Sequence, residues 1–392
     1  MDTIRFAAVG VALVALSLGA SATQAADYVP PGGRIAYALD SLHWAIYQPK
    51  DGFVNKQECP DGVNIGPRAQ FEALFPDKAH RTVVGTRLRY ESDVWFPTAA
   101  PDQFVFHEGS GPIASGMNLD GKIGPNDFTS PEGEKGIDNQ LYRVLGCIAS
   151  YRPDDNANDY FDNDEINTDN YNRILIELTG VESLMNSPHV EVTVYRGLES
   201  LMASATGSGF VAGGTQQIDT RWGRKYIQHF QGKIIDGVLT TEPHDFVFPW
   251  ATLGNPADEF MHAARFQLKL TPTAAEGLIG GYTDIETWYL QTNEEESTHH
   301  QGYGELSAPS LYKAFRRLAD AYPDPKTGAN TAISSALRAQ FVQVFILHPE
   351  NPALEASSAM PPIPYAGSPS YPRTPEQARL EQPAQITSEN HR

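Results

Sequence analysis

The segment Arg265-Phe266-Gln267-Leu268-Lys269-Leu270 alternates apolar and polar side chains at every second residue. Successive side chains of a β-strand point to opposite faces, so the three apolar residues would share one buried face. Ile174–Leu178 and Val190–Tyr195 also carry an apolar residue at every second position. Half-buried strands of this kind are typical of antiparallel sheets.

Turn-forming residues are spread along the chain, which has 29 prolines and 33 glycines among 392 residues. Such a composition favours many short elements joined by turns and argues against a helical bundle. The sequence therefore predicts a mainly β fold, with an antiparallel β-sandwich core and appended helices near both ends. An α+β fold is the alternative.

Helical patterns flank the predicted sheet. Residues 310–321 place their large apolar side chains on one face and their charged side chains on the other. Shorter helices are predicted for residues 68–75 and 139–148, the second with Asp138 as its N-cap. Residues 35–47 fit either a helix or a strand, and we favour the helix.

The N-terminus has the order of a secretory signal peptide. Arg5 precedes an apolar run over residues 6–18, and small residues follow up to Ala26. We expect cleavage after Ala25, with cleavage after Ala22 as the alternative. The apolar run is too short to cross a bilayer. The pattern predicts an exported bacterial protein of the periplasm or the extracellular space, with no membrane span.

The chain carries a formal net charge of -19. A surface this acidic repels phosphate backbones and anionic lipid headgroups, so we expect no nucleic acid partner. It attracts divalent cations instead. Charge that merely keeps an exported protein in solution is the simpler interpretation.

Cys59 and Cys147 are the only cysteines of the chain. In an oxidising compartment, a single pair of thiols is expected to be bridged. The closed loop is long, so the chain-entropy model gives a stabilisation of about 4 to 5 kcal/mol. We therefore predict a structural disulfide.

The segment Gly116–Asp127 spaces its oxygen-bearing side chains as a cation-binding loop would. Asn118 and Asp120 fall at its third and fifth positions, Gly121 at the sixth and Asp127 at the twelfth. This dozen residues resembles the calcium loop of EF-hand and dockerin-type repeats, although Gly116 replaces the first carboxylate. The resemblance implies Ca²⁺ as a structural ion. An ordinary turn at Asp120-Gly121 is the alternative.

A second acidic segment covers residues 154–169 and contains no lysine or arginine. Its carboxylates would repel one another unless water separates them or a bound ion neutralises them. Aspartate and asparagine oxygens suit a hard cation, so Asp162 and Asp164 are further candidate Ca²⁺ ligands. A solvated acidic loop is the alternative.

Composition divides the chain into four parts. We predict a signal peptide at residues 1–25, an N-terminal region with the acidic loops at 26–170 and the β-sandwich region with C-terminal helices at 171–348. Residues 349–392 are rich in proline and poor in large apolar side chains, which predicts a disordered tail.

These features predict an exported binding or structural protein that is not an enzyme and that calcium stabilises. Its partner would be a protein or a carbohydrate. The basic and aromatic segment Arg221–Tyr226 could stack on a sugar ring or pair with a carboxylate. A sheet-edge strand whose long cationic side chains extend to the solvent is the interpretation that we favour for this segment. The alternative is a secreted hydrolase of polysaccharide or ester substrates, in which two loop carboxylates act as general acid and base. Its candidate acids are Glu108, Glu177, Glu191 and Glu286.

Overall fold

The structure is a computed structural model. It describes residues 28–49, 57–64, 76–80, 88–90, 93–95, 106–148, 151–152, 163, 166, 172–207, 209–250, 258–289 and 308–350. The predicted signal peptide, the predicted helix at 68–75 and the segment 351–392 of the predicted tail lie outside these residues.

Strands dominate the described part of the chain. They are β1 (Arg34–Trp44), β2 (Leu88–Tyr90), β3 (Asp93–Trp95), β4 (Phe128–Thr129), β5 (Lys135–Ile137), β6 (Ile174–Thr179), β7 (Asn186–Arg196), β8 (Gly214–Gln217), β9 (Gln228–Ile235), β10 (Val238–Thr241), β11 (His244–Pro249), β12 (Asp258–Leu270), β13 (Ala274–Asp284), β14 (Ala321–Pro323) and β15 (Asn330–Leu347). The helices include α2 (Leu141–Leu145), α5 (Ala308–Leu318) and the 3-10 turns η1 (Pro31–Gly33), η2 (Lys78–His80) and η6 (Thr220–Trp222), and residues 285–289 are helical as well.

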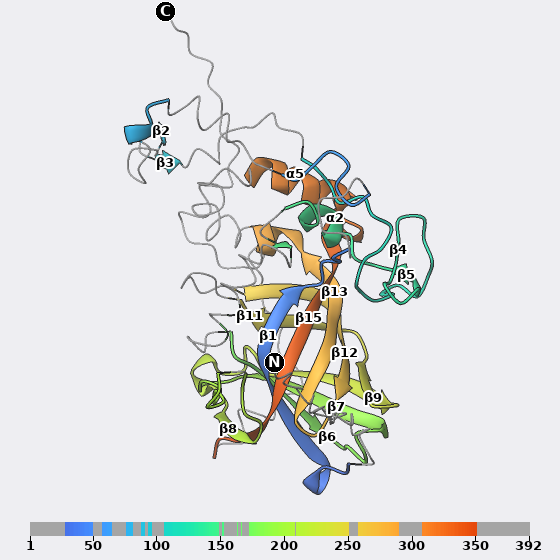
Figure 1. Ribbon diagram of the computed structural model, residues 1–392, viewed down its shortest axis with the longest axis vertical. Coiled ribbons are helices and arrows are strands. Elements are labelled where there is room, and N and C mark those ends of the chain that lie inside the picture. Colours follow the sequence, from blue (N-terminus) through green and yellow to red (C-terminus); the bar gives the residue numbers. More distant parts are fainter. Residues whose placement is uncertain are drawn as a thin grey trace, which may run out of the picture.

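Eight strands form a closed, barrel-like antiparallel sheet in the order β1-β6-β7-β9-β10-β12-β13-β15, because β15 pairs back onto β1. Their order in the sheet follows their order in the chain. β11 and β14 extend the wall beside β12 and β15, and β8 runs parallel to the end of β15. Figure 1 shows β1 and β15 side by side at the closure.

The prediction of a mainly β, antiparallel fold is confirmed. A flattened closed sheet also has two layers that face each other across the core, so strand pairing alone does not separate the predicted sandwich from a barrel. β1 comes from the predicted N-terminal region, yet it pairs with β6 and β15 from the next region.

The helix that we favoured for residues 35–47 is wrong, because residues 34–44 form β1, as the strand alternative has it. A bulge at Asp40 shifts the register between Leu39 and Ser41. Ile35, Tyr37 and Leu39 lie in the main core at alternate positions, and the bulge moves the next core residue to Leu42. Ile35, Leu39 and Leu42 therefore also have the spacing of four and three residues that a helix would have.

The predicted helix at the C-terminal end of the fold is confirmed as α5, and that at 139–148 as the shorter α2. Asp138 does not cap α2, which is a second correction. The carboxylate of Asp138 instead accepts hydrogen bonds from the backbone N–H groups of Leu119 and Asp120. In Figure 1 both helices lie at one end of the closed sheet. No helix in the described ranges is long and apolar enough to span a membrane.

The interior of the sheet is packed with side chains. Phe266 is completely buried, and its ring centroid lies 5.0 Å from that of Phe230 and 5.6 Å from that of Phe246. Trp44, Trp250, Trp288 and Phe315 continue this core toward α5. Because side chains fill the interior of the sheet, a ligand would bind on its outer wall.

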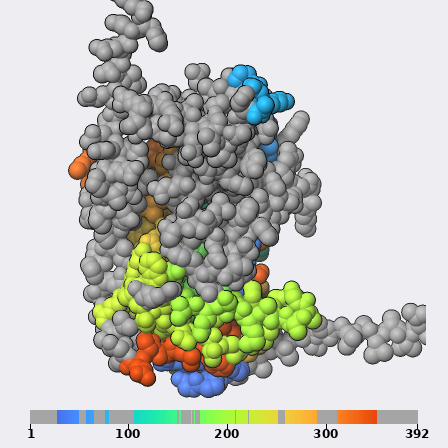
Figure 2. Space-filling view, turned by 90° about the vertical axis from the view of Figure 1, so that its left-hand side faces the viewer, coloured from blue at the N-terminus to red at the C-terminus, as the bar shows by residue number. Residues whose placement is uncertain are grey.

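Part of the outer wall is covered by the chain between β7 and β9. Leu201 and Ile218 from this segment pack on Leu175 and Val344 of the sheet in a second, smaller core. In Figure 2 the green covering segment lies on the surface beside the orange end of β15 and the blue start of β1.

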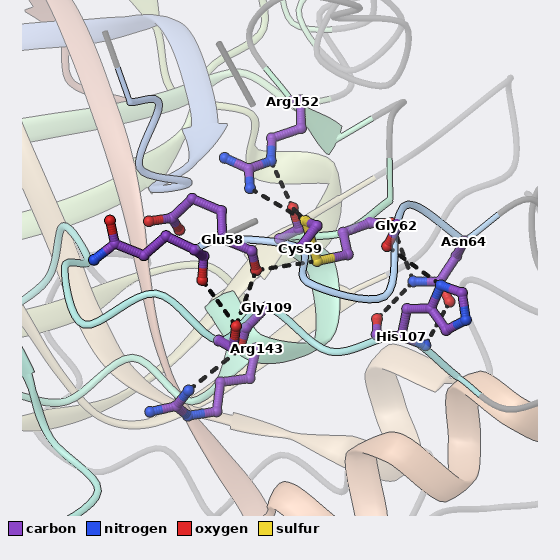
Figure 3. The surroundings of a disulfide bond; sticks show 12 residues. Glu58, Cys59, Gly62, Asn64, His107, Gly109, Arg143 and Arg152 are labelled. Atoms are coloured by element: carbon purple, nitrogen blue, oxygen red, sulfur yellow. Dashed lines mark hydrogen bonds between the residues drawn. A yellow bond between two sulfur atoms is a disulfide. The ribbon is translucent and has the colours of Figure 1, made fainter. Parts of the chain in front are cut away.

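The predicted disulfide between Cys59 and Cys147 is confirmed, with Cα atoms 5.8 Å apart and both cysteines buried. The side-chain amide of Asn64 donates to the backbone oxygens of His107 and Cys147, and its Oδ1 accepts from the N–H of His107. Figure 3 shows these contacts around the bridge. Together they fasten residues 57–64 to His107, which precedes α2, and to Cys147, which follows it.

Candidate functional site

In the loop predicted to bind calcium, side-chain oxygens accept hydrogen bonds from backbone N–H groups of the same loop. Asn118 Oδ1 accepts from the N–H of Gly121 at 2.7 Å, and Asp120 Oδ1 accepts from the N–H of Lys122 at 2.8 Å. A carboxylate oxygen of Asp127 accepts from the N–H of Gly124. These three candidate ligands therefore shape the loop, and calcium binding by them stays a prediction.

The other two candidate calcium ligands, Asp162 and Asp164, lie outside the described residues. Two neighbours from the same acidic segment are described. Asn163 Oδ1 accepts from the N–H of Leu42 in β1 at 2.8 Å, and Ile166 is buried in the main core. Asn163 is thus held on β1, and Ile166 is held in the core. No group of three histidine, cysteine or acidic side chains in the described residues is arranged to hold a metal ion.

The four glutamates considered as catalytic acids contact different basic side chains. Glu108 contacts Arg317, Glu177 contacts Arg34 and His348, Glu191 contacts His229, and Glu286 contacts Arg316. A two-carboxylate mechanism needs two acids that flank one scissile bond. Among the residues described, these ion pairs bring no two of the four glutamates to a common basic partner.

The basic and aromatic segment is occupied by contacts within the protein. The Arg196 guanidinium lies 4.6 Å from the ring centroid of Trp222, and the Lys225 ammonium lies 5.4 Å from the same centroid. Lys225 also pairs with Asp258 at 2.5 Å, and the hydroxyl of Tyr226 donates to Asp258 at 2.6 Å. Arg196 and Lys225 therefore lie over the ring of Trp222 on which a ligand would have to stack.

A different region of the outer wall combines strained backbone with polar side chains. Asp236, Ala263 and Tyr322 are the non-glycine residues with positive φ in the described parts of the chain. Asp236 lies in the two-residue turn between β9 and β10, where such a φ is expected. A left-handed conformation costs roughly 1 to 2 kcal/mol for other residues and often marks a functional site. Ala263 and Tyr322 flank the side chain of His262.

Ala263 lies at a bulge in β12, where the pairing with both β11 and β13 shifts register. The bulge turns His262 outward, opposite Tyr282 of β13. The ring of His262 stacks on that of Tyr322, with centroids 4.1 Å apart and planes inclined by 18°. His262 Nδ1 lies 3.7 Å from Asp245 Oδ1, and the N–H of Ala263 donates to the same oxygen at 3.1 Å.

Arg265 ties this region to the loop that was predicted to bind calcium. Its guanidinium donates to the backbone oxygens of Leu119 at 2.7 Å and Asn118 at 3.4 Å. Tyr282 lies close enough to the loop for Asp138 and Asp120 to contribute to its raised pKa, after the larger effect of burial. We call Asp245, His262, Arg265, Tyr282 and Tyr322 the His262 cluster.

The acids around the cluster differ in their proton affinity. The contact with His262 and the hydrogen bond from Ala263 hold the pKa of Asp245 below its ordinary value. Burial raises the pKa of Asp138, and the nearby carboxylates of Asp127 and Asp120 add to that rise. At neutral pH, Asp245 is therefore a firmly ionised group beside the stacked rings.

Asp320 should make stability depend on pH. Its carboxylate accepts from both the N–H and the hydroxyl of Ser334. Loss of water around this carboxyl raises its pKa to about 6, and the charge of Asp138 adds to the rise. The ordinary value is about 3.9, so the folded state binds this proton more tightly than the unfolded chain.

The contribution of Asp320 to stability is therefore complete below about pH 4 and is lost as the pH rises through about 6. We expect the free energy of unfolding of the parent to fall relative to that of Asp320→Asn over this interval. Urea unfolding of both proteins across the interval measures the difference. An NMR titration that places the Asp320 carboxyl near 4 would contradict the prediction.

No known protein family model matches the chain, and no curated protein or solved structure shows significant similarity to it. The candidate site therefore depends on geometry alone.

The sequence predictions did not identify the His262 cluster. One signal was available in β12, where the inward-facing residues run Leu270, Leu268, Phe266 and Ala264 and then change phase to Met261. Such a change of phase predicts a bulge, and bulges are common beside functional sites. The contacts with Tyr322 and the Asn118 loop have no counterpart in local sequence.

Proposed function

We propose that this chain is an exported binding protein without a catalytic role, and that the His262 cluster is its ligand surface. One observation carries the proposal: two left-handed, non-glycine residues hold a stacked histidine and tyrosine on the outer wall. Strain of this kind persists only where the surrounding structure enforces it, and it concentrates at ligand sites. The disulfide and the signal-like N-terminus support export.

Binding is favoured over hydrolysis because Asp245 is the one carboxylate among the five residues of the cluster. His262 and Asp245 resemble a base and its orienting carboxylate, but a nucleophile would also have to lie near the histidine. Ser334, the hydroxyl opposite Tyr282, is buried and donates to Asp320. The hydrolase remains the alternative, and release of product by the purified chain would favour it.

The ligand surface can be tested by screening short oligosaccharides and short peptides with ligand-observed NMR. We expect at least one compound to bind the parent and to lose most of its affinity in Tyr322→Asn. Asparagine tolerates the left-handed conformation, so this variant removes the ring while keeping the backbone. Tyr28→Asn, at another exposed tyrosine, is the matched control. Equal binding by parent and Tyr322→Asn would reject this surface.

Calcium is a second part of the proposal, with Asn118, Asp120 and Asp127 as ligands. Its support is electrostatic, since Asp120 and Asp127 both raise the pKa of Asp138 and a bound cation would relieve that repulsion. An ion that binds only the folded state stabilises it by about 2.7 kcal/mol at a hundredfold excess over its Kd.

The melting temperature should therefore rise when Ca²⁺ is added to chelated protein, and Asp120→Asn should reduce the rise. Mg²⁺ serves as the control because it demands a tighter octahedral geometry. An identical melting curve with and without Ca²⁺ would leave these carboxylates as a solvated surface.

A further inference from the structure

We infer that the His262 cluster binds an organic cation, an ammonium or guanidinium group of the lysine or arginine type. This inference rests on the proposed function and adds the chemistry of the ligand. The cation would lie on the exposed face of Tyr322 and pair with the carboxylate of Asp245.

The aromatic part of the site is a supported ring. His262 covers one face of Tyr322 in a near-parallel stack, and Tyr282 meets Tyr322 edge-on with centroids 5.7 Å apart. Tyr322 nevertheless remains 39% exposed. A tyrosine ring that is supported on one face and still partly exposed is suited to a cation, which is attracted by the negative face of the ring.

The carboxylate of Asp245 is both accessible and fixed. Its side chain is 60% exposed, and the backbone N–H of Ala263 holds Oδ1 in place beside His262. A ligand cation can therefore reach a carboxylate that needs little reordering. Preorganisation of this kind lowers the entropic cost of binding.

The charged residues around the cluster favour a positively charged ligand. Besides burial, the negative charges of Asp320 and Asp120 raise the pKa of Tyr282, and the positive charge of Arg265 lowers it. All three side chains therefore lie close enough to the site to influence the charge of a ligand. The guanidinium of Arg265 is directed to the backbone oxygens of Asn118 and Leu119. The surroundings are thus acidic, as is the whole chain at -19. Anionic ligands are repelled, and a neutral sugar would gain nothing from the charge of Asp245.

Titration calorimetry of the whole chain tests this ligand class with three probes at about 0.1 M salt: N-acetyl-arginine amide, spermidine and a heptapeptide rich in lysine. The same heptapeptide with glutamine in place of lysine is the neutral control. We expect the cationic probes to bind and the neutral peptide not to bind. Tight binding of the heptapeptide alone would identify a polypeptide as the source of the cation, and tight binding of spermidine a free amine.

Variants distinguish a specific site from general attraction to an acidic surface. Asp245→Asn and Tyr322→Asn should each weaken the cationic probe about three- to thirtyfold, while Tyr322→Phe, which keeps the ring, should bind as the parent does. Asp61→Asn removes the same charge from an exposed position outside the cluster and should change nothing. Equal losses in Asp61→Asn and Asp245→Asn would overturn the inference.

The rate of carbethoxylation of His262 separates this inference from the proposed function. One outcome is that a neutral compound from the ligand screen slows the carbethoxylation of His262 while the cationic probes do not. That result would reject a cationic ligand and would keep the His262 cluster as the ligand surface. Failure of every compound to protect His262 would reject both. Thermal unfolding of each variant confirms that it is folded before its affinity is compared.

Discussion

Replacing Phe266 by alanine is expected to lower the free energy of unfolding by about 3 to 5 kcal/mol, because a buried aromatic side chain is lost and a cavity is left. Phe266 is completely buried, and the rings of Phe230 and Phe246 pack against it almost edge-on. These residues come from β12, β9 and β11, so the cavity would open where three strands meet. The surrounding sheet is closed and can collapse only in part.

Urea unfolding measures this effect, with the midpoint and slope fitted separately. Phe266→Leu keeps much of the volume and should cost less than about 1.5 kcal/mol. Phe345→Ala is the matched surface control, since Phe345 is 59% exposed and should change stability by less than about 0.5 kcal/mol. Similar losses for Phe266→Ala and Phe345→Ala would mean that Phe266 is not in the core.

Removing the disulfide in the double variant Cys59→Ser, Cys147→Ser is expected to cost about 2 to 5 kcal/mol. The bridge closes a loop with a sequence separation of 88, so the unfolded chain gains much freedom when the bond is absent. Both cysteines are buried, so mild reductant should act slowly on the folded protein.

The control for this prediction is reductant itself. Dithiothreitol should lower the stability of the parent and leave the double variant unchanged. Thiol labelling of denatured, unreduced protein should find no free cysteine. Two reactive thiols for each chain under these conditions would show that the bridge does not form in solution.

The loop of residues 116–127, predicted to hold calcium, shows that ligand spacing has more than one structural use. Asn118, Asp120 and Asp127 have the spacing of a cation loop, but the same side chains can accept from the backbone of their own turn. Spacing alone does not distinguish the two uses. The thermal unfolding experiment with Ca²⁺ does.

Local pattern was sufficient for several elements. Alternation over residues 265–270 identified the C-terminal half of β12, and the amphipathic spacing around Leu311 and Phe315 identified α5. The disulfide followed from the presence of only two cysteines in a chain expected to be exported. These predictions succeeded because each depends on residues within a few positions of one another, or on a pair with no competitor.

By itself, then, the sequence determined that the chain forms antiparallel strands with one buried face and that its two cysteines pair. Only the tertiary structure decided that β15 returns to β1 and closes the sheet, that residues 34–44 are a strand, and that His262 meets Tyr322 and Asp245. The physical reason is that side-chain periodicity reports which face of an element is buried but not which element covers it. The contacts of Arg265 with Asn118 and Leu119 join residues almost 150 positions apart, and no local pattern encodes such a meeting.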